Sequence, residues 1–142
     1  MKKTLAARGI YNANFVAQKK SWKLRALSRD VSKPLPFSNG FFDKVFCICV
    51  IEHLPSSVRR LMMKEINRVL KPGGVAAFTT DYDHQRPVSI TDKGLRFAYR
   101  KKFFAEVIEP SNMTLIGNTD LLDPQPQDNF LGAFFLKKSS YL

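Results

Sequence analysis

Ionisable side chains follow two apolar runs in the middle of the chain. Glu52 and His53 come directly after the first run, Val45–Ile51, and Asp81 and Tyr82 come directly after the second run, Val75–Thr80. An imidazole titrates near neutral pH, so His53 could take a proton from a hydroxyl or an amine. The alternatives are that His53 only shapes a pocket and that Glu52 only orients a loop.

These residues share one edge of a sheet if the two runs are parallel strands. The run Val45–Ile51 is continuous and rich in β-branched residues, which is typical of a strand buried on both faces. A helix is predicted between the runs, with a serine hydroxyl of Ser56–Ser57 capping its start and Pro72–Gly73–Gly74 ending it. Such a crossover returns parallel and right-handed. Because ligands bind outside the carboxyl ends of parallel strands, the sequence predicts a small-molecule site at this edge.

The predicted helix has an apolar face and a polar face, so it should lie on the outside of the sheet. We expect the buried face to hold Val58, Leu61, Met62, Ile66, Val69 and Leu70, and the outer face to hold Arg59, Arg60, Lys64, Asn67, Arg68 and Lys71.

Other elements are predicted from turn residues and apolar spacing. They are a helix end at Leu5–Gly9, a short strand from Trp22 to about Arg29, a loop over residues 33–42 packed by Phe37, Phe41 and Phe42, a helix from Thr91 to about Glu109 ended by Pro110, and strands over Met113–Thr119 and Phe130–Leu136. The segment between the last two strands is long, and such loops commonly overhang a site.

Length and composition predict a single domain over residues 1–142, large enough for a real core. No apolar run approaches membrane-spanning length and no secretory leader is visible. Cys47 and Cys49 lie two apart in the first run, so they share a face and cannot easily bridge each other. Without a second Cys/His cluster, no metal site is expected, and small core residues in a reducing, cytoplasmic location fit.

The net charge of +11 is unevenly distributed. Residues 1–29 form a basic head that holds eight Lys or Arg residues and no acid, and Lys93–Lys102 adds a second basic cluster. This balance favours contact with polyanions, including nucleic acid or anionic substrates. One alternative is a solvated basic surface. Another is an organellar transit peptide, since such peptides are also basic and poor in acidic residues.

The central stretch also resembles a known family. LPFSNGFFDKVFCICVIEHL followed by EINRVLKPGGVAAFTTDY, with Asp30 upstream, is similar to the second half of class I S-adenosylmethionine-dependent methyltransferases. The resemblance covers roughly residues 29–137, and Asp43, the IEH triplet and LKPGG are its most specific parts. It implies an α/β, Rossmann-like three-layer fold with an antiparallel C-terminal edge, and methyl transfer from S-adenosylmethionine to an unidentified acceptor, small or macromolecular.

The resemblance also implies roles for single residues. The Asp30 carboxylate would accept a hydrogen bond from the adenine amino group, with the backbone N–H of Val31 beside the ring. The alternative for Asp30 is a turn residue before Pro34. The first strand would end near Ile48, and Ile48–Cys49–Val50 would line the cofactor through backbone atoms. Glu52, Asp81 and Tyr82 would face the substrate, and His53 would be the catalytic candidate.

The chain departs from the family pattern at its start. The glycine-rich turn is absent, since Gly9 is the only glycine before Gly40, and no acid precedes Asp30. We therefore expect an N-terminally truncated domain that lacks the opening strand, turn and helix. The chain could be a fragment, a degenerate copy or one piece of a split enzyme. It would then self-associate or need a partner that supplies a strand. The alternative function is a non-catalytic basic binding module on a degenerate methyltransferase fold.

Overall fold

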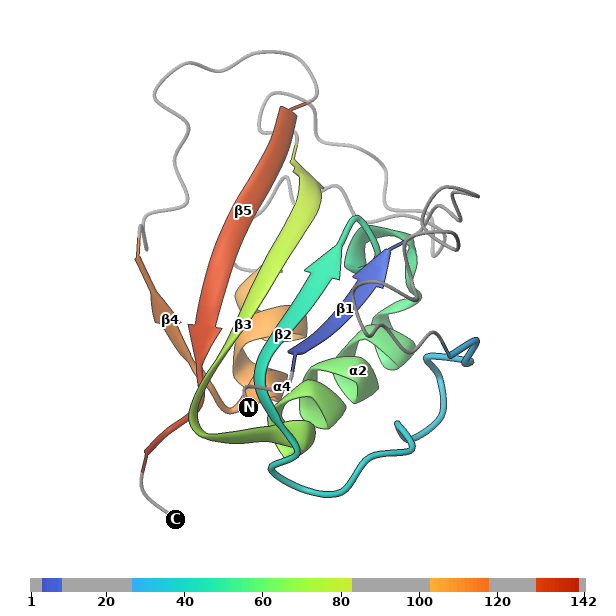
Figure 1. The fold of residues 1–142 in the computed structure, drawn as a ribbon. Helices are drawn as coiled ribbons and strands as arrows, with labels where there is room; N and C mark the ends of the chain where they lie inside the picture. Colours follow the sequence, from blue (N-terminus) through green and yellow to red (C-terminus); the bar gives the residue numbers. More distant parts are fainter. Residues whose placement is uncertain (1–3, 9–26, 83–102, 118–129, 141–142) are drawn as a thin grey trace, which may run out of the picture.

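The computed structural model describes residues 4–8, 27–82, 103–117 and 130–140. They form a five-stranded sheet in the order β1-β2-β3-β5-β4 (Figure 1). The strands are β1 (Thr4–Arg8), β2 (Phe42–Ile48), β3 (Leu70–Tyr82), β4 (Thr114–Ile116) and β5 (Phe130–Lys137). Strands β1, β2 and β3 are parallel, whereas β5 is antiparallel to both β3 and β4. The parallel pairing of β2 with β3 and the antiparallel C-terminal edge confirm the predicted topology.

Helices α2 (Ser56–Val69) and α4 (Glu109–Ser111) lie against each other on one face of the sheet (Figure 1). A π-helical turn, η2 (Phe104–Ile108), leads into α4, and a 3-10 turn, η1 (Ile51–His53), precedes α2. The predicted serine cap is wrong, because no side chain caps the first turn of α2.

The core lies between the helices and alternate residues of the strands, as the period of two in a strand requires. On β3, Ala76, Phe78 and Thr80 are buried. Phe78 stacks on Phe134 of β5 with ring centroids 4.7 Å apart, and Phe103 meets Phe134 edge-on. The helix layer contributes Met62, Met63, Ile66, Val69, Phe103, Val107 and Ile108.

Strand β2 ends before the apolar run from which it was predicted. The run predicts a strand over Val45–Ile51, but β2 ends at Ile48, as the family resemblance predicts. The reason is the backbone of Cys49, whose φ is +50°, a left-handed conformation that interrupts an extended chain. Ile51 then belongs to η1.

The predicted faces of α2 are wrong at Arg59 and Leu61, and Leu70 and Lys71, which were expected in the helix, belong to β3. Arg59, expected outside, is 1% exposed, and Leu61, expected inside, is 51% exposed. Helical spacing itself places Arg59 with Met62, Met63 and Ile66, because these positions follow the i, i+3, i+4, i+7 pattern. Arg59 was expected at the surface because it is charged, although its position in the helix indicates the buried face.

The Pro72–Gly73–Gly74 segment lies inside β3, so the expected strand Val75–Thr80 is only part of a longer element. The pairing with β2 shifts register between Phe42 and Lys44, which accommodates the segment. Gly73 has φ +73°, and its N–H donates to Lys138 and Ser139 carbonyls at 3.2 Å. A Cβ on Gly74 would lie 2.9 Å from the Lys71 carbonyl oxygen, so close packing requires glycine there.

The start of the chain also differs from prediction. Thr4–Arg8, expected as a helix end, forms β1, which pairs in parallel with β2 from Lys44 to Ile48. The edge of β2 is therefore covered by this chain. Of the strand predicted from Trp22 to about Arg29, residues 22–26 lie outside the described residues, and Leu27–Arg29 has no regular structure. Most of the basic head lies outside the described residues too.

The C-terminal predictions are confirmed only in the part that the structure describes. Of the helix predicted from Thr91 to about Glu109, residues 91–102 lie outside the described residues. From Phe103 the chain is helical as far as Ser111, so Pro110 does not end the helix. The π-helical turn before Pro110 accounts for this, because a wider turn accommodates a residue without an N–H. Strand β4 is shorter than Met113–Thr119, and β5 extends the predicted strand by one residue. The linking segment, residues 118–129, lies outside the described residues.

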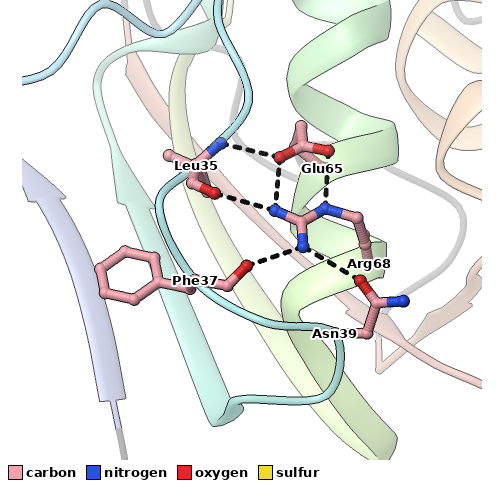
Figure 2. A network of polar contacts seen from close by, with 5 residues as sticks. All are labelled: Leu35, Phe37, Asn39, Glu65 and Arg68. Atoms are coloured by element: carbon pink, nitrogen blue, oxygen red, sulfur yellow. Dashed lines mark hydrogen bonds and ion pairs between the residues drawn. The ribbon is translucent and has the colours of Figure 1, made fainter.

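A five-membered polar network fixes the loop before β2 to helix α2 (Figure 2). The Arg68 guanidinium forms a double hydrogen bond with the Glu65 carboxylate, both distances 2.8 Å. It also donates to the carbonyls of Leu35 and Phe37 at 3.0 and 2.7 Å and to Asn39 Oδ1 at 3.0 Å. Leu35 N donates to Glu65 Oε2 at 2.8 Å.

The guanidinium therefore uses all five of its N–H groups. The rings of the same loop pack as predicted, with Phe37, Phe41 and Phe42 centroids 4.8 to 5.4 Å apart. These contacts hold the chain between Leu35 and Phe42 in one conformation.

The first prediction concerns this network. Arg68→Met should lower the free energy of unfolding by about 1–3 kcal/mol, because two loop carbonyls and Glu65 lose a charged donor. The hydrogen bond from Arg68 is also the main cause of the lowered pKa of Glu65. Its stabilisation is complete above the ordinary carboxyl pKa and is lost as pH falls through the lowered value, so the difference from wild type should shrink in acid.

Denaturant titration measures the effect. The control is Arg60→Met, which removes an exposed arginine of the same helix and should change stability by less than about 0.5 kcal/mol. Equal effects of the two substitutions would show that the network does not hold the loop.

Candidate functional site

The turn that follows β2 is hydrogen-bonded to β3 near the carboxyl end of that strand. Cys49 N donates to the carbonyl oxygen of Thr79 at 3.0 Å and to its hydroxyl at 3.2 Å. Ile48 ends β2 with 37% of its surface exposed, and Cys49 and Val50 are half-buried. The residues predicted to line a cofactor thus form one backbone turn at the sheet edge.

Glu52 is buried beside this turn although it carries a carboxylate. It is 3% exposed, and its Oε2 accepts a hydrogen bond from the Thr80 hydroxyl at 3.3 Å. Its Oε1 is the one buried side-chain oxygen of the described residues without a hydrogen-bond partner. Leaving such an atom unbonded typically costs about 1–3 kcal/mol, so a buried carboxylate oxygen in this state calls for an explanation.

His53 lies at the outer side of Glu52. Its imidazole is 68% exposed, and Nε2 is 3.9 Å from Glu52 Oε1. That separation is too long for a hydrogen bond, although it is within range of a charge interaction. The sequence predicts that Glu52 and His53 follow the strand at the sheet edge, and the structure has both in η1, the element that follows β2. Their roles at a substrate stay predictions.

Arg59 supports this turn from the helix side. Its Nε donates to the Ile51 carbonyl at 2.9 Å and its Nη2 to the Leu54 carbonyl at 2.5 Å. Its Nη1 forms an ion pair with Glu106, which is also buried. Burial lowers the pKa of Arg59, and the charge and hydrogen bond of Glu106 oppose that shift. The arginine thus fixes both ends of η1, which carries Glu52 and His53.

Among the residues that the structure describes, the charges buried around η1 do not balance. Glu52 and Glu106 bring two carboxylates, and Arg59 brings one guanidinium, which is already bonded to Glu106. A buried charge is usually paired, because taking it out of water unpaired is costly. The remaining carboxylate, Glu52, accepts one hydrogen bond from the Thr80 hydroxyl and interacts with Arg59 through its charge.

Cys47 lies on the buried face of β2. Burial is the largest cause that raises the pKa of its thiol to about 12, with the charge of Glu52 as the next cause. The thiol is therefore neutral at physiological pH and a poor nucleophile. Cys49 is half-buried at the edge, and both cysteines are free, as expected for core thiols that cannot bridge.

Asp30 forms a local turn. Its Oδ1 accepts hydrogen bonds from the Ser32 hydroxyl at 2.7 Å and the Ser32 N–H at 2.9 Å. The Ser32 hydroxyl is the main cause that lowers the pKa of this fully exposed carboxyl group. Val31 is half-buried beside it. The turn alternative is confirmed, and the role of Asp30 and Val31 at an adenine ring stays a prediction.

Asp81 and Tyr82 end β3, where their backbone pairs with Leu131 and Phe130 of β5. Their position at the same edge as Glu52 follows from the parallel pairing of β2 and β3. Their side chains lie outside the described residues, so their contact with a substrate stays a prediction.

The described residues offer neither a metal site nor a membrane-spanning helix. Within residues 4–8, 27–82, 103–117 and 130–140, no group of three or more His, Cys, Asp or Glu side chains could hold a metal ion. None of the helices described is long and apolar enough to cross a membrane.

The family model described as "Methyltransferase domain" matches residues 5–78, just over half of the chain. The chain therefore belongs to the methyltransferase-domain family, and the sheet described above is the Rossmann-like fold of class I methyltransferases. No curated protein sequence matches it.

Solved structures share the fold. The cyclase SpnF is 14% identical with a TM-score of 0.65, over 89% of this chain and 60% of that one. An S-adenosylmethionine-dependent methyltransferase from Methanosarcina mazei is 13% identical with a TM-score of 0.60, over 96% of this chain and 82% of its own.

A third structure is the 1,6-didemethyltoxoflavin-N1-methyltransferase from Burkholderia thailandensis, bound to its substrate and S-adenosylhomocysteine. It is 15% identical with a TM-score of 0.64, over 96% of this chain and 60% of its own length. This chain thus spans about 60% of the length of SpnF and of the Burkholderia enzyme. Likeness at this level concerns the fold, and one fold can host several reactions.

The second prediction tests whether Glu52 is held at a cost to stability. Glu52→Gln should raise the free energy of unfolding by about 1 kcal/mol, because an amide keeps the bond to Thr80 and costs less to bury than an unpaired charge. Thermal melts at neutral pH measure the change. The matched control, Glu109→Gln, removes the same charge from an exposed residue of α4. A marked loss of stability in Glu52→Gln alone would show that the carboxylate is a structural requirement.

Proposed function

We propose that this chain binds S-adenosylmethionine at the carboxyl edge of β1, β2 and β3 and transfers its methyl group to an acceptor. The observation that carries the proposal is the turn Ile48–Val50 at the end of β2, in a chain of the methyltransferase-domain family, with Glu52 and His53 directly after it. Two proteins of the same fold support the choice of cofactor: the S-adenosylmethionine-dependent methyltransferase from Methanosarcina mazei and the Burkholderia enzyme bound to S-adenosylhomocysteine.

The residues present fit this cofactor in two respects. Ile48 offers an exposed apolar surface at the edge, which suits an adenine ring. Both bonds from Ser32 go to Asp30 Oδ1, which leaves the exposed Oδ2 to accept from an amino group. The cofactor would supply a methyl group activated by a positive sulfonium, and Ile48–Val50 would hold it through backbone atoms.

The chain's own contribution would be mainly positioning. A methyl group passes from donor to acceptor by in-line displacement, so alignment of the two molecules carries most of the catalysis. Arg59 fixes η1 through the carbonyls of Ile51 and Leu54, and thereby sets the positions of Glu52 and His53. His53, exposed at the edge, would take the proton that the acceptor releases.

The third prediction tests cofactor binding without knowledge of the acceptor. S-adenosylhomocysteine should bind saturably in calorimetry and should slow the reaction of Cys49 with a thiol reagent, because the cofactor would cover the Ile48–Val50 turn. Cys47 should stay unreactive in the folded chain with or without ligand, since its pKa is about 12. Mass spectrometry of the labelled peptide separates the two cysteines after Cys→Ser substitution of either one.

The result also decides between the two candidate functions. Saturable binding with protection of Cys49 supports the methyltransferase. A folded chain that binds neither S-adenosylmethionine nor S-adenosylhomocysteine would refute it and favour the non-catalytic basic binding module.

The fourth prediction concerns the adenine end of the site. Asp30→Ala should weaken S-adenosylhomocysteine binding by about 1–3 kcal/mol, because the amino group loses its charged acceptor. Ser32→Ala is the control, since it removes a hydrogen bond of the turn and keeps the carboxylate. Similar losses in both variants would assign Asp30 to the turn alone, and unchanged affinity in Asp30→Ala would remove it from the site.

A further inference from the structure

The pair formed by Glu52 and His53 has a geometry that selects among possible methyl acceptors. Glu52 Oε1 is buried without a hydrogen-bond partner, and His53 Nε2 lies 3.9 Å away at the exposed edge. Two atoms at this separation cannot bond each other, but a third atom can lie within hydrogen-bonding distance of both. The group between them must then satisfy a carboxylate oxygen and an imidazole nitrogen at once.

Glu52 Oε1 and His53 Nε2 are both hydrogen-bond acceptors when the imidazole is neutral with its proton on Nδ1, so two donors are needed to satisfy them. A carboxylate only accepts hydrogen bonds, and the bare Nε2 of such an imidazole also accepts. A hydroxyl group has one hydrogen to donate, whereas the nitrogen of a primary amine has two. A primary amine can therefore bond both atoms and still keep its lone pair for attack.

The charge around η1 also favours an amine as the acceptor. Of the two buried carboxylates, Glu106 is bonded to Arg59, so the charge of Glu52 is left without a cation bonded to it. A neutral amine becomes positively charged as it gains a methyl group, and a nearby carboxylate stabilises that charge. A phenolate, thiolate or carboxylate acceptor must approach as an anion, and the same carboxylate would repel it.

From these two features we propose that the methyl acceptor is a primary amine whose two N–H groups bridge Glu52 Oε1 and His53 Nε2. This inference rests on the proposed methyl transfer. The nitrogen lone pair forms the new N–C bond, and the S–C bond breaks with its electron pair left on sulfur. The product is an alkylammonium and S-adenosylhomocysteine, and the ammonium proton passes to His53 Nε2 and then to solvent.

The test uses three probes of nearly equal shape on the full chain loaded with S-adenosylhomocysteine. Benzylamine has two N–H groups when neutral, benzyl alcohol has one O–H group, and N,N-dimethylbenzylamine has none when neutral. At a pH above the pKa of both amines, where they are largely neutral, benzylamine should bind at least about tenfold more tightly than either of the others, as expected from the added hydrogen bond to a charged group. With S-adenosylmethionine in place of the product, benzylamine should yield N-methylbenzylamine.

Two variants assign the preference to the pair. Glu52→Gln should bind benzylamine no more tightly than benzyl alcohol, because the amide lacks the charge. Glu109→Gln, the exposed control on α4, should keep the preference of the wild type. As a measurement on the unmodified chain, benzylamine should shift the carboxylate carbon resonance of Glu52 in NMR spectra, and benzyl alcohol should not.

The outcomes separate the two proposals. Equal binding of amine and alcohol, a preference that persists in Glu52→Gln, or no benzylamine binding by a chain that does bind S-adenosylhomocysteine would each overturn the amine assignment and leave the methyltransferase standing. Failure of the folded chain to bind S-adenosylhomocysteine would overturn the proposed function, and the inference with it.

Discussion

The buried guanidinium of Arg59 is the contact on which the site depends. It donates to the carbonyls at both ends of η1 and pairs with Glu106 of η2, so one side chain joins the turn after β2 to both helical segments. A guanidinium suits this role because its donors spread in a fixed planar fork. The separation between Glu52 and His53 is set through this contact, because both residues belong to the turn that Arg59 holds.

A buried ion pair contributes little net stability, because the cost of desolvation offsets most of the attraction. The pair of Arg59 and Glu106 is better understood as a device that fixes geometry. An apolar side chain could fill the same volume, but it would leave the carbonyls of Ile51 and Leu54 without donors. At this position α2 therefore has a buried arginine in place of an apolar side chain, and this arginine fixes the position of η1.

Sequence reasoning identified the strand–helix–strand unit and the edge at which Glu52 and His53 lie, because apolar periodicity and the parallel crossover determine both. It missed features that depend on contacts distant in the chain. The role of Arg59 depends on Glu106, 47 residues away. The end of β2 depends on the left-handed backbone of Cys49, which residue type does not reveal. Thr4–Arg8 is a strand because β2 offers it a pairing edge, whereas Leu5–Arg8 alone would favour a helix.

The order of the strands constrains how the chain assembles. Strand β5 lies between β3 and β4, and β3 pairs with it over residues such as Val75 and Lys137, far apart in sequence. The unit β2–α2–β3 has only short-range connections, so it can form early, while β4 has no place in the sheet until β5 is available. During synthesis, the outer edge of β3 therefore stays open until almost the last described residues emerge. For this fold, the risk of mispairing is therefore highest before β5 is made, while the edge of β3 has no partner strand.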